Sequence, residues 1–204
     1  MKKIFNMIIG TTLASLGIAC ILNSNLGCFS ITACYKALSD LFNIPLAIAN
    51  VLIEVLMICY AIHKGEGLGL TAIFNATYGA LMINLFHSIL PCIKILGFGG
   101  FLLPIGWCLM GKAGMGDTGT NILTRALMKS TGKHLSLIRV FIDGIFLIIA
   151  YIGAPQYVTW FTLLITFGCG PLLQLAYKLM GYEPIKIKHK FLINKRWFNW
   201  IIFY

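Results

Sequence analysis

The chain has 204 residues, of which 59% are hydrophobic and 11% are charged, and its mean hydropathy is +0.88. Soluble domains carry about 25% charged residues, so this composition excludes a soluble globular protein and predicts an all-α integral membrane protein. The net charge of +10 does not indicate nucleic-acid binding. The basic residues lie at the ends of apolar runs and in the carboxy-terminal tail, where they set topology and contact lipid headgroups.

Six apolar runs are predicted to cross the membrane, because each approaches the roughly 20 residues that a hydrocarbon core requires. They are residues 4–22, 45–62, 68–90, 95–110, 135–153 and 158–180. The first run follows Met1-Lys-Lys, as in a signal peptide. No small-residue cleavage site follows it, so we expect it to remain as the first span.

Two shorter segments, residues 28–42 and 118–131, are too short and too polar to cross alone. Asn23-Ser-Asn-Leu-Gly27 breaks the chain before the first segment, and the glycine-rich residues 111–119 break it before the second. Asn43 and Pro45 predict the start of the helix that follows the first segment. We therefore expect a short, polar broken-helix segment in each half of the chain.

The two halves resemble each other in sequence. Residues 22–54 align without gaps on residues 111–143 when the chain is displaced by 89 positions. Lys36 then falls on Arg125, and Glu54 falls on Asp143, so charges match within otherwise apolar runs. This pattern predicts one structural unit used twice.

The predicted organisation follows from this repeat: a first membrane repeat at 1–90, a junction at 91–98, a second repeat at 99–181 and a basic, aromatic tail at 182–204. If the short segments do not cross, each half has three spans and the second half is inverted. If they cross, the repeats are parallel. The inverted arrangement is favoured because, with Lys2 and Lys3 inside, only Lys36 and Lys94 lie outside. Both termini are then cytoplasmic.

The candidate substrate- or ion-binding residues are Glu54, Asp143, Arg139, Asn50 and Asn75. Asn50 and Glu54 are four residues apart, as are Arg139 and Asp143, so each pair shares a helix face. Ionisable groups at membrane depth cost about 2.5–3.5 kcal/mol each and therefore face an interior. In one interpretation Arg139 binds a carboxylate or phosphate and an acid takes a proton or cation. In the other, a buried ion pair fixes how the halves dock.

A second candidate is an anion-binding loop formed by Gly116, Asp117, Thr118 and Gly119. A helix that starts near Thr118 would present free amides and a positive dipole end to an anion. The alternative is a tight turn between a span and a helix. The sequence has no nucleophile–base pair, and its cysteines lack zinc-ligand spacing. We therefore expect neither an enzyme nor a bound metal or cofactor.

The tail alternates basic and aromatic residues, which is typical of a segment that lies on anionic lipid headgroups. Its basic residues are Lys186, Lys188, Lys190, Lys195 and Arg196, and its aromatic residues include Phe191, Trp197, Trp200 and Phe203. A docking surface for a protein partner is the alternative interpretation of the same pattern.

Several short motifs resemble those of the YczE/YitT group of bacterial integral membrane proteins. They are Leu26-Gly27, Gly69-Leu-Thr71 with Gly79, Ala113-Gly-Met-Gly116, Thr131-Gly-Lys133 followed by Ser136 and Arg139, and Gly168-Cys-Gly-Pro171. The chain is more similar to the YczE branch, because the soluble carboxy-terminal domain of the YitT branch has no room here. The resemblance implies a multi-pass protein of the bacterial cell membrane and no agreed substrate. Asn50 departs from the pattern, because its counterpart Arg139 is basic.

The predicted function is a small-solute carrier or substrate-binding membrane subunit with a polar site between the repeats, as in transporters built from inverted repeats. It includes the substrate-capturing subunit of an energised uptake complex. The alternative is a non-transporting accessory or scaffold protein that stabilises or localises a partner. A protein partner and a homo-oligomer both remain open.

Overall fold

The computed structural model describes residues 2–184, and this part of the chain contains helices and no strand. The predicted all-α class is therefore confirmed. Residues 185–204, which make up nearly all of the predicted interfacial tail, lie outside the described residues.

Within residues 2–184, three helices are long and apolar enough to cross a membrane: α1 (Lys2–Asn23), α8 (Leu135–Gly153) and α9 (Trp160–Leu179). A shorter apolar stretch, Ile48–His63, lies within α3 (Leu46–His63). These helices carry large apolar side chains on their outer faces; Ile152 and Leu179, for example, are 78% and 77% exposed. Such a surface suits hydrocarbon rather than water, so the chain has the features of a membrane protein.

The remaining helices are shorter. They are α2 (Ser30–Phe42), α4 (Leu70–Phe74), the π-helical η1 (Asn75–Gly79), α5 (Ala80–Ile89), the 3-10 helix η2 (Lys94–Phe101), α6 (Leu102–Ala113), α7 (Gly119–Thr131) and the 3-10 helix η3 (Pro155–Tyr157). The predicted spans 68–90 and 95–110 thus correspond to successive helical pieces of different type. α9, in contrast, continues through Pro171 without unwinding.

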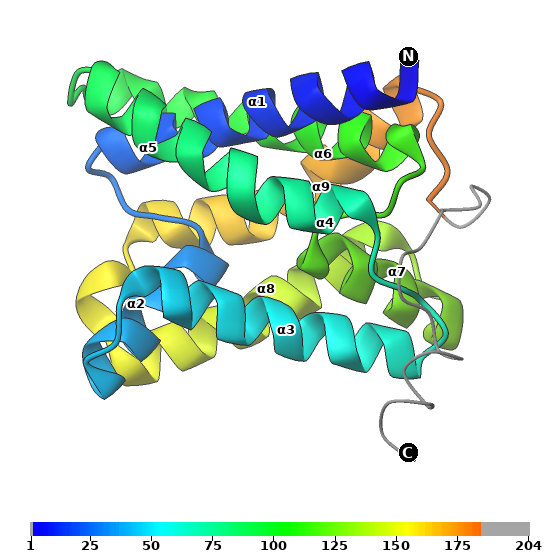
Figure 1. Ribbon diagram of the computed structural model, residues 1–204. Coiled ribbons are helices and arrows are strands. Elements are labelled where there is room, and N and C mark those ends of the chain that lie inside the picture. Colours follow the sequence, from blue (N-terminus) through cyan, green and yellow to red (C-terminus); the bar gives the residue numbers. More distant parts are fainter. Residues whose placement is uncertain (1, 185–204) are drawn as a thin grey trace.

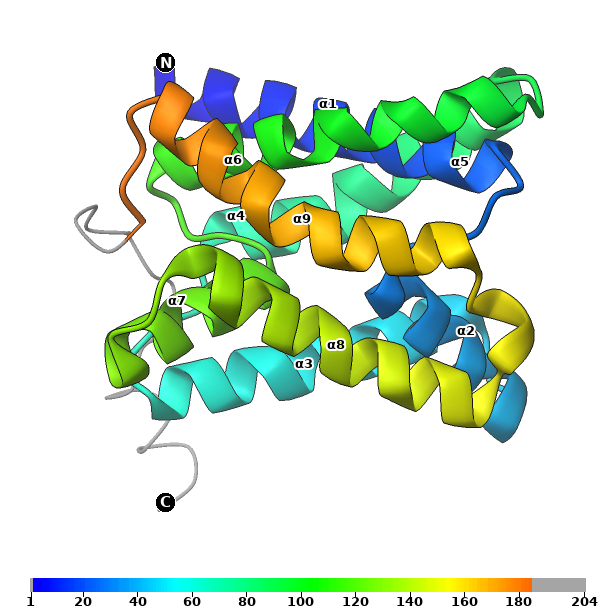
Figure 2. The same ribbon diagram turned by 180° about the vertical axis from the view of Figure 1, so that it is seen from behind.

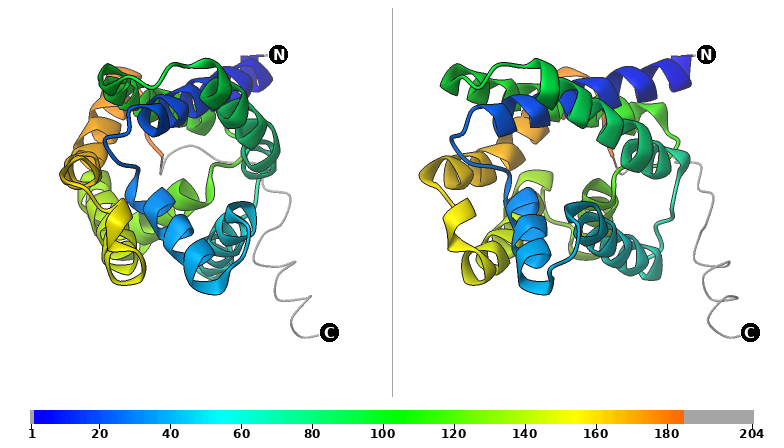
Figure 3. Two further views of the ribbon diagram at one scale, coloured as in Figure 1. Left: turned by 90° about the vertical axis from the view of Figure 1, so that its left-hand side faces the viewer. Right: turned by 60° about the vertical axis from the view of Figure 1, so that its left-hand side comes forward.

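The helices form two layers joined by crossing segments (Figure 1). α1, α5 and α6 lie in one layer, and α2, α3, α7 and α8 lie in the other. The continuous segment α4–η1–α5 crosses one face of the molecule, and α9 crosses the opposite face, which is turned forward in Figure 2. Seen along the long helices, the elements surround a common centre (Figure 3, left).

Glycines bring α1 and α6 into close contact. A Cβ atom on Gly10 would lie 2.7 Å from the carbonyl oxygen of Gly106, and one on Gly106 would lie 2.6 Å from that of Gly10. About two helical turns further along α1, a Cβ on Gly17 would lie 3.0 Å from the carbonyl oxygen of Gly99. Small residues at these positions allow the backbones to approach, which is how membrane helices commonly pack.

The short helices α2 and α7 lie at opposite ends of the molecule (Figure 1). Each has 13 residues and is therefore about 20 Å long, too short for a hydrocarbon core of about 30 Å. α2 packs against α8 and α3, and α7 packs against α3 and α8. The start of α1 and the end of α9 lie at the same end of the molecule as α7, in Figure 1 above it.

Both short helices end in a left-handed residue. Asn43 (φ 50°) caps α2, and Gly132 (φ 68°) caps α7. Asn43 was expected to cap the start of the next helix, but it ends the preceding one, and Pro45 stands at the start of α3. The physical reason is that asparagine tolerates left-handed backbone better than most residues.

Candidate functional site

Two acids in the middle of long helices meet the first turns of the short helices. Glu54 lies midway along α3, and its Oε2 accepts a hydrogen bond of 3.0 Å from the backbone N–H of Gly119, the first residue of α7. Asp143 lies midway along α8, beside the hydroxyl of Ser30, the first residue of α2. Helix amino termini have free N–H groups and a positive dipole end, which suit carboxylates.

Arg139 joins these elements into one polar network. Its Nε donates to Asp143 Oδ2 at 2.8 Å, and its Nη1 donates to Asn121 Oδ1 at 3.1 Å. Asn121 Nδ2 in turn donates to Asp117 Oδ1 at 2.9 Å. The guanidinium also lies over the ring of Trp107, 4.5 Å from its centre. The network therefore runs from α8 through α7 to the loop that precedes α7, with α6 beneath it.

Most of the network is withdrawn from the surface. Arg139 is 1% exposed and Asp143 is not exposed at all, while Glu54 is half-buried and accepts a 3.4 Å hydrogen bond from the Tyr35 hydroxyl. Among the described residues, Arg139 Nη2, Asp143 Oδ1 and Ser30 Oγ are buried without a hydrogen-bond partner of good geometry. Buried polar atoms are nearly always satisfied. These atoms belong to the groups around Arg139, so the polar interior of the network is concentrated there.

The network contains more acids than bases. Arg139 interacts electrostatically with three acids, Glu54, Asp117 and Asp143. Arg125, which lies in α7, also interacts with Asp117. Uncompensated charge is costly to hold at this depth. The three acids of the network therefore depend on the neighbouring arginines to compensate their charge.

A second charged cluster closes the end of the molecule that holds α7. Arg125 Nε lies 2.8 Å from Glu66 Oε2, and Lys129 Nζ lies 2.6 Å from Glu66 Oε1. Arg125 and Glu66 are 2% and 1% exposed, whereas Lys129 is 45% exposed. Burial alone would raise the pKa of the Glu66 carboxyl, but the two cations hold this pKa below its ordinary value. Glu66 lies in the loop between α3 and α4, so this cluster ties that loop to α7.

The opposite end carries a weaker counterpart. The Lys36 ammonium lies 4.9 Å from the centre of the Tyr157 ring, and the Tyr157 hydroxyl donates to Asp40 Oδ2 at 2.9 Å. Lys36 and Asp40 are the positions that correspond to Arg125 and Lys129. The contact ties α2 to the turn before α9 at the surface, because Asp40 is exposed.

The structure places the predicted site residues in three ways. Arg139, Asp143 and Glu54 come together as the core of the network. Asn50 is half-buried one turn before Glu54, and Asn75 lies in η1 with its side chain beside Gly79. No hydrogen bond among the described residues joins either asparagine to the network.

The predicted anion-binding loop lies inside the molecule. Gly116 (φ 97°) packs against Gly69, and Thr118 donates its backbone N–H to Asp117 Oδ1 at 2.9 Å. The start of α7 at Gly119 agrees with the expected helix start near Thr118. The first backbone N–H of α7 donates to the carboxylate of Glu54. The protein's own carboxylate therefore occupies the position where a bound anion was expected.

Sequence reasoning did not identify Asn121, Trp107, Tyr35 and Ser30. Asn121 and Trp107 carry no signal of their own, because single polar or aromatic residues on apolar helices are common. Ser30 had a usable signal, since the alignment of the halves places it on Gly119, the residue that binds Glu54.

Residues 1–178 match a family described as a family of unknown function (DUF6198), and the chain therefore belongs to that family. No curated protein matches the chain. No solved structure matches it either.

Proposed function

We propose that this DUF6198 member is a small-solute carrier or substrate-binding membrane subunit, and that its site is the network around Arg139. The observation that carries the proposal is the meeting of two mid-helix acids with the first turns of two short helices, around one buried guanidinium. Transporters with broken helices bind their solutes and coupling ions in such places. Arg139 would bind an anionic group of the solute, and an acid of the network would take a proton or cation. The similarity to the YczE branch is part of this proposal.

The proposed architecture is two inverted repeats of three spans each, with α2 and α7 entering from opposite ends without crossing. It is supported by contacts that exchange when residue i of one half is replaced by residue i+89 of the other. The contact of Gly10 with Gly106 becomes that of Gly17 with Gly99. The contact of Glu54 with Gly119 likewise becomes that of Asp143 with Ser30.

Backbone conformation supports the same symmetry. Six of the eight positive φ angles among the described residues form three pairs that are 89 positions apart, and only Gly65 and Gly181 have no counterpart. These pairs are Asn25 and Gly114, Gly27 and Gly116, and Asn43 and Gly132. Such angles are uncommon outside glycine, so their coincidence in both halves favours a common unit.

We place both termini on the cytoplasmic side of a bacterial plasma membrane. This orientation is supported by the concentration of lysines at the end that holds the start of α1 and the end of α9. A membrane-impermeant thiol reagent tests it in intact cells. Cys92, an exposed native cysteine, should react from outside, whereas Lys133→Cys should react only after the membrane is opened. The reverse pattern would overturn the orientation.

The function is tested with the purified protein in lipid nanodiscs. Its melting temperature is measured against a panel of amino acids, organic acids, sugars, vitamins and simple ions. A ligand at 100 times its dissociation constant should stabilise the protein by about 2.7 kcal/mol. Glu54→Gln should abolish this stabilisation, whereas the matched control Asp40→Asn, at an exposed acid, should preserve it.

Two results would count against the proposal. A hit that survives unchanged in Glu54→Gln and Arg139→Gln would place the solute elsewhere. A flat panel with normally folded wild-type protein would favour the accessory-protein interpretation, in which the network only holds the two halves together.

A further inference from the structure

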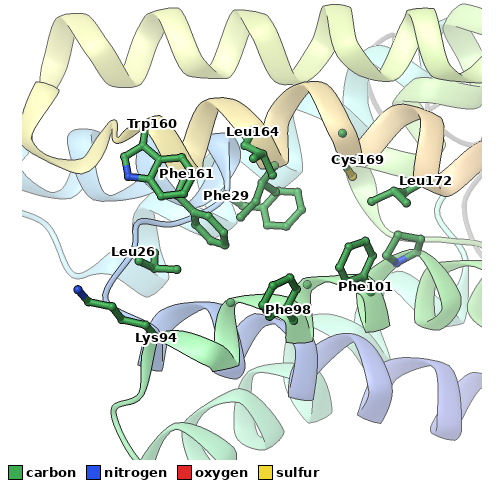
Figure 4. A pocket seen from close by; sticks show the side chains of 15 residues that line it. Leu26, Phe29, Lys94, Phe98, Phe101, Trp160, Phe161, Leu164, Cys169 and Leu172 are labelled. Atoms are coloured by element: carbon green, nitrogen blue, oxygen red, sulfur yellow. The ribbon is translucent and has the colours of Figure 1, made fainter.

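An apolar groove runs along the outside of α9 (Figure 4). It has a volume of about 260 Å³ and lies between α9, η2 and the start of α6. Its walls are formed mainly by Phe29, Phe98, Phe101, Trp160, Leu164 and Leu172. Phe98, Trp160 and Leu164 are 71%, 65% and 58% exposed, so the groove opens sideways. Because α9 is a candidate membrane-spanning helix, this opening faces hydrocarbon.

The groove has a defined length and direction. It extends along α9 from Trp160 to Leu172, which corresponds to about 18 Å of helix. Half of a hydrocarbon core is about 15 Å thick. Lys94 lies at the end beside Leu26 and Trp160, and its side chain points outward (Figure 4). Tryptophan is typical of the membrane interface, so this end is the headgroup end.

We propose that the groove binds one acyl chain of an anionic phospholipid and that Lys94 contacts its phosphate. The apolar walls match a single chain of one leaflet in length and polarity. Lys94 supplies the complementary charge at the interface, where a phosphate would lie. A free phosphate has nothing to gain from the apolar walls, so the lipid is the occupant that both features select.

The first half of the chain is held together differently at the positions that correspond to the groove. There the corresponding helices are joined by hydrogen bonds: Thr12 to the Tyr78 hydroxyl at 3.1 Å, and Ser15 to the carbonyl oxygen of Gly79 at 3.1 Å. Displaced by 89 positions, Thr12 and Ser15 become Phe101 and Pro104, and Tyr78 and Gly79 become Phe167 and Gly168. These side chains cannot form the same hydrogen bonds.

The inner wall of the groove lies next to the central network. The Phe29 ring makes an edge contact with the Trp107 ring, with centroids 6.0 Å apart. The Arg139 guanidinium lies over that same Trp107 ring. Cys169, which lines the groove, also interacts electrostatically with Arg139. A chain bound in the groove would therefore pass one layer of side chains from the buried guanidinium.

Native mass spectrometry of the purified protein tests the proposal, with dioleoyl phosphatidylglycerol, the zwitterionic dioleoyl phosphatidylcholine and soluble glycerol phosphate as probes. The wild type should retain one phosphatidylglycerol more tightly than phosphatidylcholine, and it should not bind glycerol phosphate. Gly168→Leu should weaken binding about tenfold, as expected when roughly two methylene groups lose their place. Gly144→Leu is the matched control. A Cβ at Gly144 and a Cβ at Gly168 both meet nothing within 4 Å, but only Gly168 lines the groove.

The headgroup contact is tested separately. Lys94→Gln should remove the preference for phosphatidylglycerol but keep chain binding, whereas the exposed control Lys133→Gln should change neither. Leu164→Phe, which narrows the groove at an exposed position, serves if Gly168→Leu fails to fold. Wild-type protein without a discrete lipid adduct would overturn the proposal. So would a dimer that Gly168→Leu dissociates, which would place a second copy in the groove, or phosphate binding without a chain.

Discussion

Removal of the Arg139 guanidinium should strongly destabilise the protein. Arg139 is 1% exposed and its partner Asp143 is fully buried, so Arg139→Gln leaves a buried carboxylate without its counter-charge. Breaking such a pair costs about 3–5 kcal/mol. Loss of the contact with Trp107 adds up to about 2 kcal/mol, as for a desolvated cation–π pair. The double variant Arg139→Gln/Asp143→Asn should recover most of the first contribution, because neither group is then charged.

The assay is equilibrium unfolding in mixed micelles titrated with sodium dodecyl sulfate and followed by tryptophan fluorescence. Lys133→Gln, at an exposed position, controls for the loss of one positive charge and should stay within about 0.5 kcal/mol of wild type. The reasoning is refuted if Arg139→Gln unfolds within 1 kcal/mol of wild type. A double variant as unstable as the single variant would equally contradict it.

The double variant also separates the two interpretations of the network. If it folds and loses ligand-induced stabilisation, the pair belongs to the binding site. If it folds and retains that stabilisation, the pair only docks the halves. The comparison is informative because the double variant leaves no buried charge unpaired while it removes both charged groups from the network.

Three further predictions concern positions where the geometry is tight or charged. A Cβ at Gly119 would collide with the Glu54 carboxylate, a flexible group, so Gly119→Ala should keep the melting temperature but abolish ligand-induced stabilisation. Gly69→Ala would push against backbone at Gly116 and should lower the free energy of unfolding by about 1–3 kcal/mol. Gly144→Ala, with open space, is the control for both and should be neutral or stabilising. The folded-state pKa of Glu66 is lowered, so the contribution of its carboxylate to the free energy of unfolding is complete above about pH 4.3 and is lost as pH falls through the folded pKa. Glu66→Gln should therefore reduce the loss of stability at acid pH. An unchanged dependence of the free energy of unfolding on acid pH would refute the assignment.

The helical class and the short segments could be predicted because they depend on local composition. Apolar runs of sufficient length form helices in a membrane, where every backbone polar group must be bonded internally. The start of α7 near Thr118 was likewise predictable from the glycine-rich break. Composition does not determine the type of helix. The π-helix at 75–79 and the 3-10 helix at 94–101 were therefore not predicted.

The partners of the site residues were less predictable, because they come from distant parts of the chain. Spacing alone put Arg139 and Asp143 on one face, and they do form a pair. The same spacing grouped Asn50 with Glu54, but Glu54 bonds to α7 and α2 rather than along its own helix. Asn121, which lies 18 positions from Arg139, could be found only once α7 was folded beside α8.

The two ends of the molecule, which correspond under the proposed repeat, are held by contacts of different burial and charge. At the α7 end, Glu66 is buried against Arg125, and removing one partner of such a pair leaves the other as an uncompensated buried charge. At the α2 end, the contact between Tyr157 and Asp40 is already at the surface, where pairing contributes little. Two halves with matching backbone angles thus differ in the strength with which each short helix is held.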